Sequence, residues 1–377
     1  MSLNKKKIVY IYPSKGIGGA PLSLLYLIEQ LDLKKYQPKV IFLQKSDAVD
    51  LFKLKGIDTR ICSNIYYNYF GFSEVNVKRF SFKLFLKQIF SWFLNAFIIG
   101  KRILKEEKPY LVHLNSSTLS DWAVAAKLLS IPVIVHIREP IAKNHFRIGK
   151  FFLRQIYKHC TKKIIAISYD NAKRLNVLNK TEVIYNFVDF NYFDKTLKPK
   201  IQNEKTKFVL YLGGQSRRKG FENVVNSLQY LDKNITVLFA GYYYDSSKND
   251  NLHLIKMRTS HNAKEVGLIE NIPQYLADSF LLISTFSIPH FSRPIIEAGA
   301  MAKPVIATML EGIEEMVIDG ETGILVKPGN PEMLANAINK ICDDEILARK
   351  LGEAGYQRAK QLFNAEKNAE ATFKLYE

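Results

Sequence analysis

Short β-branched runs alternate along the chain with longer amphipathic stretches. Apolar runs of strand length lie at residues 7–13, 39–44, 111–115, 132–139 and 162–168. Helical patterns such as PLSLLYLIEQL and SDWAVAAKLLS stand between them. The alternation restarts after residue 200, with apolar runs at residues 207–214, 234–244, 280–285, 303–308 and 323–328. Strands that alternate with helices are typical of parallel sheets with crossover connections, and here the pattern occurs twice.

The fold class predicted is therefore α/β, with two doubly wound Rossmann-like domains. We place the first domain at residues 1–185, a polar, Lys-rich hinge at 186–206 and the second domain at 207–361. A helical tail at 362–377 is long enough to return to the first domain. Doubly wound domains bind ligands at the carboxyl ends of their strands, so we expect the two domains to face each other across an active-site cleft.

The excess of positive charge is confined to the first half of the chain. Residues 1–185 hold 31 Lys and Arg against 12 Asp and Glu, whereas residues 186–377 hold 23 against 24. Such a field favours an anionic partner, either a membrane surface, a nucleic acid or a phosphorylated substrate, although a merely solvated basic surface would look the same. Nucleic acid is the weakest of these readings, because the sequence contains no nucleic-acid-binding module.

Composition adds only a few constraints. The chain is 47% hydrophobic and 24% charged, as expected of a globular protein with a sizeable core. Its three cysteines have neither disulfide nor metal-ligand spacing, which favours a reducing compartment. The apolar run before Pro13 reads as a first strand rather than a signal peptide, so we expect a cytoplasmic protein.

Residues 80–109 are both aromatic and basic. The segment has no charge between Gln88 and Gly100, which is far short of the roughly 20 apolar residues of a membrane span. Two readings stay open: an amphipathic helix on anionic lipid, which would place the protein at the inner face of the membrane, or an ordinary helix packed on the first sheet.

Three stretches contain candidate ligand chemistry. In SKGIGGAPLSLL, Gly16, Gly18 and Gly19 would let backbone approach a ligand at a helix start, a weak signal on its own. In YLGGQSRRKGFENVVNSL, three cations next to a helix start favour a pyrophosphate, although a basic solvated turn is the alternative. These cations are Arg217, Arg218 and Lys219.

The third stretch is STFSIPHFSRPIIEAGAMAKPVIAT, residues 284–308. Pro294 predicts a helix start, with Ser292 or Arg293 near the cap. We place Glu297 in the first turn, where the helix dipole would keep the carboxylate ionised and able to accept hydrogen bonds from a ribose diol. An exposed glutamate that only compensates the dipole is the structural alternative.

Together these pieces resemble the family 4 retaining glycosyltransferases of the GT-B fold. EEKPYLVHLNSS is similar to the PDVVH strand of that family, and VIYNFVDFNYF is similar to its VIPNGVD segment. GGQSRRKG stands where the family has a Gly-Arg and Lys-Gly phosphate loop. FSRPIIEAGAMAKPVIAT corresponds to its FGxxxxEAMAxGxPVVAT stretch, so the match spans nearly the whole chain.

The resemblance implies transfer of a sugar from a nucleotide donor with retained anomeric configuration and without a metal or other cofactor. Lys219 would bind the donor diphosphate, with Arg218, and Glu297 the ribose. Leu268 and Ile269 would frame the base, and His136 would reach toward the transferred sugar. The remaining assignments are Gly18, Gly19, Gly214, Arg217, Phe291 and Arg293 on the donor side, and Asn115 and Arg138 on the acceptor side.

The sequence departs from the family pattern at two places. Pro289 stands where the family has its first glutamate, so contacts to the sugar ring would have to come from His290, Ser292 or backbone amides. Gly214 stands at the loop arginine, which Arg217 or Arg218 could replace.

The function expected is therefore a hexosyltransferase that acts on a saccharide or polyprenyl-linked acceptor in surface polysaccharide or glycoconjugate synthesis. A sugar-nucleotide epimerase of similar fold and a catalytically silent binding module are the alternatives. Neither the nucleotide, the sugar nor the acceptor follows from the sequence.

Overall fold

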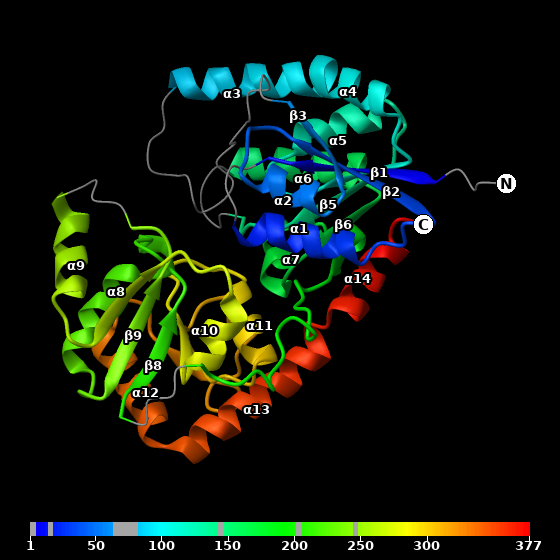
Figure 1. Ribbon diagram of the computed structural model, residues 1–377. Helices are drawn as coiled ribbons and strands as arrows, with labels where there is room; N and C mark the ends of the chain where they lie inside the picture. Colours follow the sequence, from blue (N-terminus) through cyan, green and yellow to red (C-terminus); the bar gives the residue numbers. More distant parts are fainter. Residues whose placement is uncertain (1–4, 14–17, 63–81, 142–146, 201–204, 244–247) are drawn as a thin grey trace. The chain divides into compact units, whose positions relative to one another are not determined.

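The computed structural model describes residues 5–13, 18–62, 82–141, 147–200, 205–243 and 248–377. The chain forms two compact units (Figure 1). Unit 1 comprises Met1–Asn186 and Ala365–Glu377, and unit 2 comprises Phe187–Asn364. The chain therefore passes from one unit to the other twice. Gly16 lies outside the described residues.

Unit 1 is built on a parallel sheet. Its described strands have the order β3-β2-β1-β4-β5-β6-β7. They are β1 (Lys6–Tyr12), β2 (Tyr36–Phe42), β3 (Asp58–Ile61), β4 (Leu111–Leu114), β5 (Val133–Ile137), β6 (Lys163–Ala166) and β7 (Thr181–Val183). The helical elements are α1 (Gly19–Glu29), α2 (Ala48–Leu54), α3 (Phe82–Leu94), the π-helix η1 (Asn95–Ile99), α4 (Gly100–Glu107), α5 (Ser120–Lys127), α6 (Arg147–Cys160), α7 (Tyr169–Leu175), the 3-10 turn η2 (Leu178–Lys180) and α14 (Ala365–Lys374).

Alternate residues of β1 supply the cores on the two faces of this sheet. Val9 and Ile11 pack with residues of α4, α5 and α6, whereas Ile8 and Tyr10 pack with α1, α2 and the C-terminal Tyr376. Both faces are buried, so the strands read as continuous apolar runs, as parallel sheets require.

Unit 2 repeats the arrangement. Its described strands have the order β10-β9-β8-β11-β12-β13, and all pairs are parallel. They are β8 (Lys207–Tyr211), β9 (Ile235–Ala240), β10 (Ala263–Gly267), β11 (Leu281–Ser284), β12 (Val305–Thr308) and β13 (Ile324–Val326). The helical elements are the 3-10 turn η3 (Arg217–Lys219), α8 (Phe221–Ser227), the 3-10 turn η4 (Leu228–Tyr230), α9 (Lys248–Arg258), α10 (Ile272–Asp278), α11 (Arg293–Ala300), α12 (Pro331–Asp343) and α13 (Glu345–Leu362). The prediction of two Rossmann-like α/β domains is confirmed.

The stretch expected to be a hinge packs largely on unit 2. Val188 is buried, and its N–H donates to the carbonyl oxygen of Phe363 at 2.9 Å. Further on, the N–H of Lys200 donates to Asp278, and Gln274 donates to the carbonyl oxygen of Lys198 at 3.2 Å. The first passage between the units is at Asn186–Phe187.

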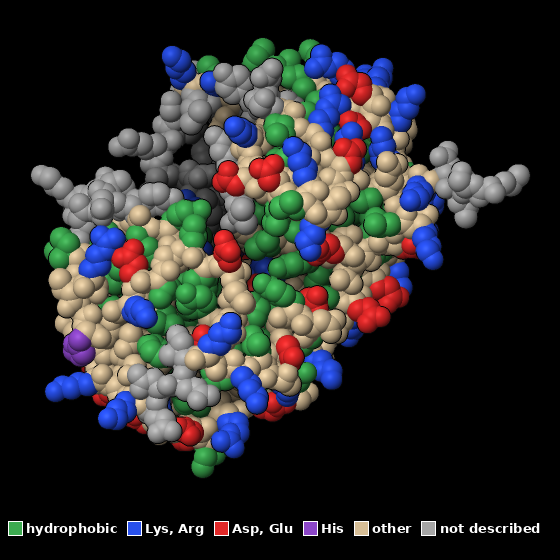
Figure 2. All heavy atoms as spheres, viewed as in Figure 1, with side chains coloured by type: hydrophobic (Ala, Val, Ile, Leu, Met, Phe, Trp, Pro, Cys, Tyr) green, Lys and Arg blue, Asp and Glu red, His purple; other side chains and the backbone are tan. Residues whose placement is uncertain are grey.

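Within the aromatic and basic segment predicted at 80–109, residues 82–107 form α3, η1 and α4, which follow one another without a break. Its inner side contributes Ala96, Ile103 and Leu104 to buried positions of unit 1. Hydrophobic and Lys or Arg side chains lie together over the edge that α3 and α4 occupy (Figure 2). In the part of the chain that the structure describes, none of the helices combines the length and the apolarity needed to cross a bilayer.

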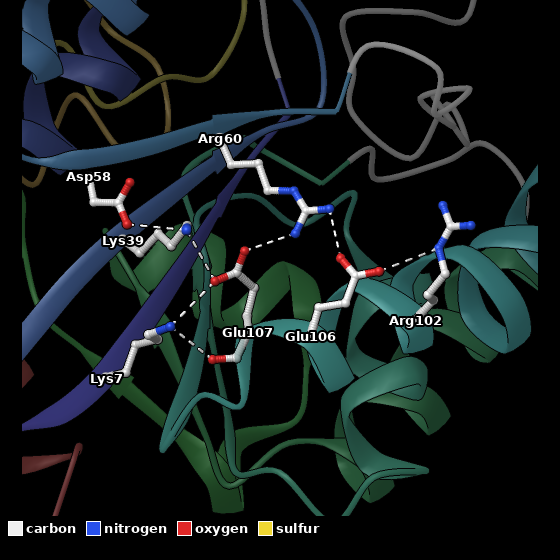
Figure 3. A network of polar contacts seen from close by, with 7 residues as sticks. All are labelled: Lys7, Lys39, Asp58, Arg60, Arg102, Glu106 and Glu107. Carbon is white, nitrogen blue, oxygen red and sulfur yellow. Dashed lines mark hydrogen bonds and ion pairs between the residues drawn. The ribbon is translucent and has the colours of Figure 1, made fainter.

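A buried carboxylate joins the end of α4 to three strands (Figure 3). Glu107 lies 2.9 Å from Arg60 of β3, 3.2 Å from Lys39 of β2 and 3.4 Å from Lys7 of β1, measured between charged atoms. Its neighbour Glu106 contacts Arg60 at 2.8 Å but remains half exposed. Because three cations surround it, the pKa of the Glu107 carboxyl stays below its usual value despite burial.

This network predicts that Glu107→Gln destabilises unit 1 much more than Glu106→Gln. Loss of the buried charge should lower the free energy of unfolding by about 2 kcal/mol, which lies between the contributions typical of exposed and of fully buried ion pairs. The exposed Glu106 should contribute well under about 1 kcal/mol. Urea unfolding followed by circular dichroism measures both values.

The pH dependence has a defined sign. A carboxyl group whose pKa is lowered in the folded state stabilises the protein above its unfolded pKa, and this contribution is lost as the pH falls through the folded value. The difference between wild type and Glu107→Gln should therefore shrink in acid. Equal effects of the two substitutions at neutral pH would contradict this account.

Candidate functional site in unit 2 and a buried polar cluster in unit 1

The loop after β8 begins with two glycines whose role is structural. Gly214 has a φ of +54°, and a Cβ there would come within 2.7 Å of the Tyr242 carbonyl oxygen and 2.9 Å of its nitrogen. Its N–H donates to the carbonyl oxygen of Ala240 at 2.9 Å. Close packing of two neighbouring loops therefore requires glycine here, independently of any ligand.

The basic part of this loop is held against the loop that follows β11. Gly220 has a φ of +79°, and a Cβ there would meet the carbonyl oxygen of Thr285 at 1.9 Å. The Thr285 hydroxyl donates to the carbonyl oxygen of Lys219 at 3.2 Å. The N–H of Ser287 donates to the carbonyl oxygen of Arg218 at 2.9 Å. β8 and β11 are neighbours in the sheet, so these loops meet at its carboxyl edge.

The cations of η3 have different surroundings. Arg217 pairs with Glu222 at 2.7 Å, with both side chains largely exposed. The Lys219 side chain is exposed overall, but the surrounding protein desolvates the ammonium group and so lowers the pKa of Lys219. Lys219 is also close enough to His290 to lower the pKa of that imidazole, after the larger effect of burial, to about 4. His290 is thus neutral near pH 7.

His290 belongs to the loop that leads into α11. Its ring stacks on Phe286 with 4.3 Å between centroids. Ser292 is the N-cap residue of the helix, and its hydroxyl oxygen lies 3.0 Å from that of Ser284. Phe291 is buried and packs edge to face against Phe363, so its side chain belongs to the core. Only the backbone of Phe291 then remains to contact a nucleotide-sugar ligand.

The sequence suggested that Glu297 lies in the first turn of α11, but the structure places it beyond that turn. The helix begins at Arg293, so Glu297 is its fifth residue and lies one turn above the first. Arg293 and Glu297 form a buried ion pair, in which Nη2 and Nε of Arg293 lie 2.9 and 3.1 Å from Oε1 of Glu297. An arginine one turn away is therefore the charge partner of this buried carboxylate, which the sequence had assigned to the helix dipole alone.

This geometry leaves Glu297 able to accept further hydrogen bonds. Both guanidinium contacts go to Oε1, and among the described residues no hydrogen bond reaches Oε2. Burial, and then the charge of Glu297, raises the pKa of the nearby Tyr192 hydroxyl. Tyr192 was not singled out from the sequence, because an exposed aromatic residue in a loop gives no pattern.

The other residues predicted in unit 2 lie near strand ends. Leu268 and Ile269 directly follow β10, and the Leu268 side chain is 59% exposed. β10 is two strands from β8, so these residues share the carboxyl edge with the basic loop. Pro289 is partly exposed and lies in the loop next to His290.

In unit 1 the predicted acceptor-side residues contact each other. Arg138, just after β5, donates to Oδ1 of Asn115 at 2.6 Å and to Oδ1 of Asn186 at 2.7 Å. His136 lies within β5 and is only 5% exposed, with Arg138 3.4 Å from its Nδ1. Its Nε2 is buried without a hydrogen-bond partner among the described residues. Glu139 binds the two serines that follow Asn115.

This buried cluster continues to the end of the chain. Nδ1 of His113 lies 2.8 Å from the Tyr376 hydroxyl, which donates to the Tyr10 hydroxyl at 3.2 Å. Burial, then the charge of Arg138, lowers the pKa of His113 to about 3, and the same two causes lower that of His136. Both imidazoles are therefore neutral. Tyr376 is a contact that no local sequence signal could have revealed.

Two predicted glycines stand at the start of α1. Gly18 is the N-cap residue of α1 and Gly19 its first residue. A Cβ on Gly18 would meet nothing within 4 Å, so packing does not require glycine there. Among the described residues, no group of three or more His, Cys, Asp or Glu side chains is placed to hold a metal ion.

Two parallel Rossmann-like units, with a basic loop beside a helix start in the second, are the architecture of the GT-B fold. Residues 17–192 match the family described as Glycosyltransferase Family 4, and residues 193–358 match Glycosyl transferases group 1. An uncharacterized glycosyltransferase of Methanocaldococcus jannaschii is 30% identical over 298 residues, which cover 76% of this chain and 80% of that protein. The chain therefore belongs to glycosyltransferase family 4.

Other relatives have named roles. The lipopolysaccharide core biosynthesis glycosyltransferase LpsE of Rhizobium meliloti is 26% identical, over 73% of this chain and 78% of LpsE. Among solved structures, HepE of Anabaena in complex with UDP and glucose is similar in fold, with a TM-score of 0.79 and 21% identity over 98% of both chains.

The Arg293–Glu297 pair predicts a strong asymmetry between single and double substitutions. Arg293→Gln leaves a buried carboxylate without its partner and should lower the free energy of unfolding by about 3 kcal/mol. In Arg293→Gln/Glu297→Gln, at least half of this loss should be recovered because no buried charge remains. Arg258→Gln, which breaks an exposed pair with Glu265, is the control and should change stability by less than about 1 kcal/mol.

Urea unfolding measures all three variants. A double variant as unstable as Arg293→Gln would show that the cost is one of packing rather than charge.

Proposed function

We propose that the protein transfers a hexosyl group from a nucleotide-sugar donor to a saccharide or lipid-linked saccharide acceptor, with retention of the anomeric configuration, in surface polysaccharide or glycoconjugate synthesis. Unit 2 binds the donor in this proposal. The roles of LpsE and of the capsular polysaccharide biosynthesis glycosyltransferase CapM of Staphylococcus aureus support the choice of process.

One observation supports the donor site above all others: the contact between the loops after β8 and β11. This contact places Lys219 near His290, two residues before the cap of α11. Backbone N–H groups at a helix start and an ammonium group both favour a phosphate. We assign the donor diphosphate to this position.

The same group of residues has a use in the reaction. When the glycosidic bond to the donor breaks, negative charge develops on the leaving diphosphate. Cations that are already in position stabilise that charge without further reorganisation. Lys219 fills this role in the proposal, with Arg218 or Arg217 beside it, and no metal ion is assigned. Because no carboxylate is assigned as nucleophile, retention would follow from attack on the face that the leaving group vacates.

Glu297 is assigned to the ribose of the donor. Arg293 holds one carboxylate oxygen, and the other can accept from a sugar hydroxyl. Leu268 and Ile269 remain assigned to the base. Since Pro289 cannot bind sugar hydroxyls through a side chain, His290 is assigned to the transferred sugar. In unit 1, Gly18 and Gly19 stay proposed for the donor phosphate, His136 for the transferred sugar, and Asn115 and Arg138 for the acceptor.

The first prediction from this proposal concerns Lys219. Lys219→Met should weaken binding of UDP or UDP-glucose, used as first probes because HepE binds UDP, by roughly tenfold to a hundredfold. The rate of transfer should fall by about a further tenfold or more, since the charge matters most in the transition state. Isothermal titration calorimetry and a transfer assay measure the two effects. Lys233→Met, at an exposed lysine of the same unit, is the matched control.

Equal affinities for wild type and Lys219→Met would remove the lysine from the donor site. Formation of an isomeric nucleotide sugar from donor alone would replace transfer by epimerisation.

The second prediction concerns stereochemistry. Proton NMR of the product should show the anomeric configuration of the donor sugar from the earliest time points. An inverted product would contradict retention while leaving the donor site itself untouched.

A further inference from the structure

The outer side of α3 and η1 is an aromatic stripe exposed to solvent. Leu86, Phe90, Phe93 and Phe97 are separated by four, three and four residues, so they lie along one face of the helix. Their exposed fractions are 50%, 68%, 54% and 47%, and the adjacent Ile98 is 61% exposed. Phe93 and Phe97 stack with 6.0 Å between ring centroids. We call these five residues the aromatic face.

Contacts on the inner side fix the rotation of the helix, so the aromatic face cannot simply turn inward. Nε1 of Trp92 donates to the Ser120 hydroxyl at 2.9 Å, and Nδ2 of Asn95 donates to Asp121 at 3.0 Å in the buried interior. Ala96 is completely buried on the same side. Exposure of the aromatic face is therefore a property of the packed helix.

Cations stand at both ends of the aromatic face. Lys83 precedes it, Lys87 lies between Leu86 and Phe90, and Lys101, Arg102 and Lys105 follow it. Between residues 82 and 105 the sequence contains no acidic residue. Figure 2 shows Lys and Arg side chains beside the hydrophobic ones along this edge.

We infer that the aromatic face docks unit 1 on an anionic lipid surface, with its aromatic rings at the level of the acyl boundary and the flanking lysines on the lipid phosphates. Aromatic and aliphatic side chains between cations are the composition of helices that lie in the plane of a membrane interface. The uncharged stretch of 13 residues at 88–100 is too short to cross a bilayer, so the helix lies on the surface.

Charge selects lipid over a second copy of the chain as the occupant. Residues 1–185 carry 31 cations against 12 anions, so two copies facing each other through this half would repel. An anionic bilayer attracts the same charges, with a strength that falls as salt screens them. This inference concerns a surface of unit 1 and does not depend on the transfer reaction.

Vesicle flotation without any sugar substrate tests the inference. The intact protein should float with phosphatidylcholine vesicles that contain about one-third phosphatidylglycerol, much less with phosphatidylcholine alone, and less as salt rises. Phe90→Ser/Phe93→Ser should reduce binding about tenfold or more, because the buried apolar area is lost. Lys83→Glu/Lys87→Glu should reduce it with a weaker dependence on salt. Leu252→Ser/Ile255→Ser, at two exposed apolar residues of α9 in unit 2, is the matched control and should bind as wild type does.

Thermal unfolding by circular dichroism should show that all variants are folded, since the substituted side chains are exposed. If the wild type binds anionic vesicles and Phe90→Ser/Phe93→Ser binds them equally well, the inference is overturned. Absence of wild-type binding to anionic vesicles would also overturn it. A dimer in light scattering that Phe90→Ser/Phe93→Ser dissociates, without vesicle binding, would assign the aromatic face to a second copy instead. Donor binding by calorimetry reports separately on the proposed function.

Discussion

The close approach of Gly220 to the carbonyl oxygen of Thr285 is the constraint on which the candidate donor site depends. The loops after two neighbouring strands can touch only because no side chain stands between them. Their contact brings the ammonium group of Lys219 near His290 and the start of α11. Catalytic power in this account comes from charge placed before the reaction begins, and a rigid sheet edge provides that placement.

In both units the buried charged side chains named here have polar or oppositely charged partners. Glu107 in unit 1 meets three cations, and Glu297 in unit 2 meets Arg293. Arg138, also buried, is satisfied by the side-chain amides of Asn115 and Asn186. The first network holds a helix on the sheet, whereas the second leaves one carboxylate oxygen available. The difference between a structural and a functional carboxylate thus lies in how many of its acceptor positions the protein itself occupies.

The two parallel sheets were predictable because buried parallel strands appear as apolar runs that any reader can locate. The basic loop and the start of α11 were also visible, since Gly, Arg, Lys and Pro mark such positions locally. The pairing of Arg293 with Glu297, four residues apart, was missed because Glu297 was placed in the first turn, where the helix dipole alone accounted for its charge. Tyr376 joins His113 across 263 residues, and a contact at that separation leaves no periodic trace. The exposure of Phe90 and Phe93 depends on how the helix is rotated, which its inner contacts determine.

The central claim, that unit 2 binds a nucleotide sugar, is tested most directly by thermal unfolding in the presence of a panel of nucleotides and nucleotide sugars. A ligand that binds only the folded state stabilises it by about 2.7 kcal/mol at a hundredfold excess over its dissociation constant. The account predicts that one nucleotide, free and as its sugar conjugate, raises the midpoint by several degrees while the others do not. A panel in which no nucleotide and no nucleotide sugar stabilises the protein would contradict it.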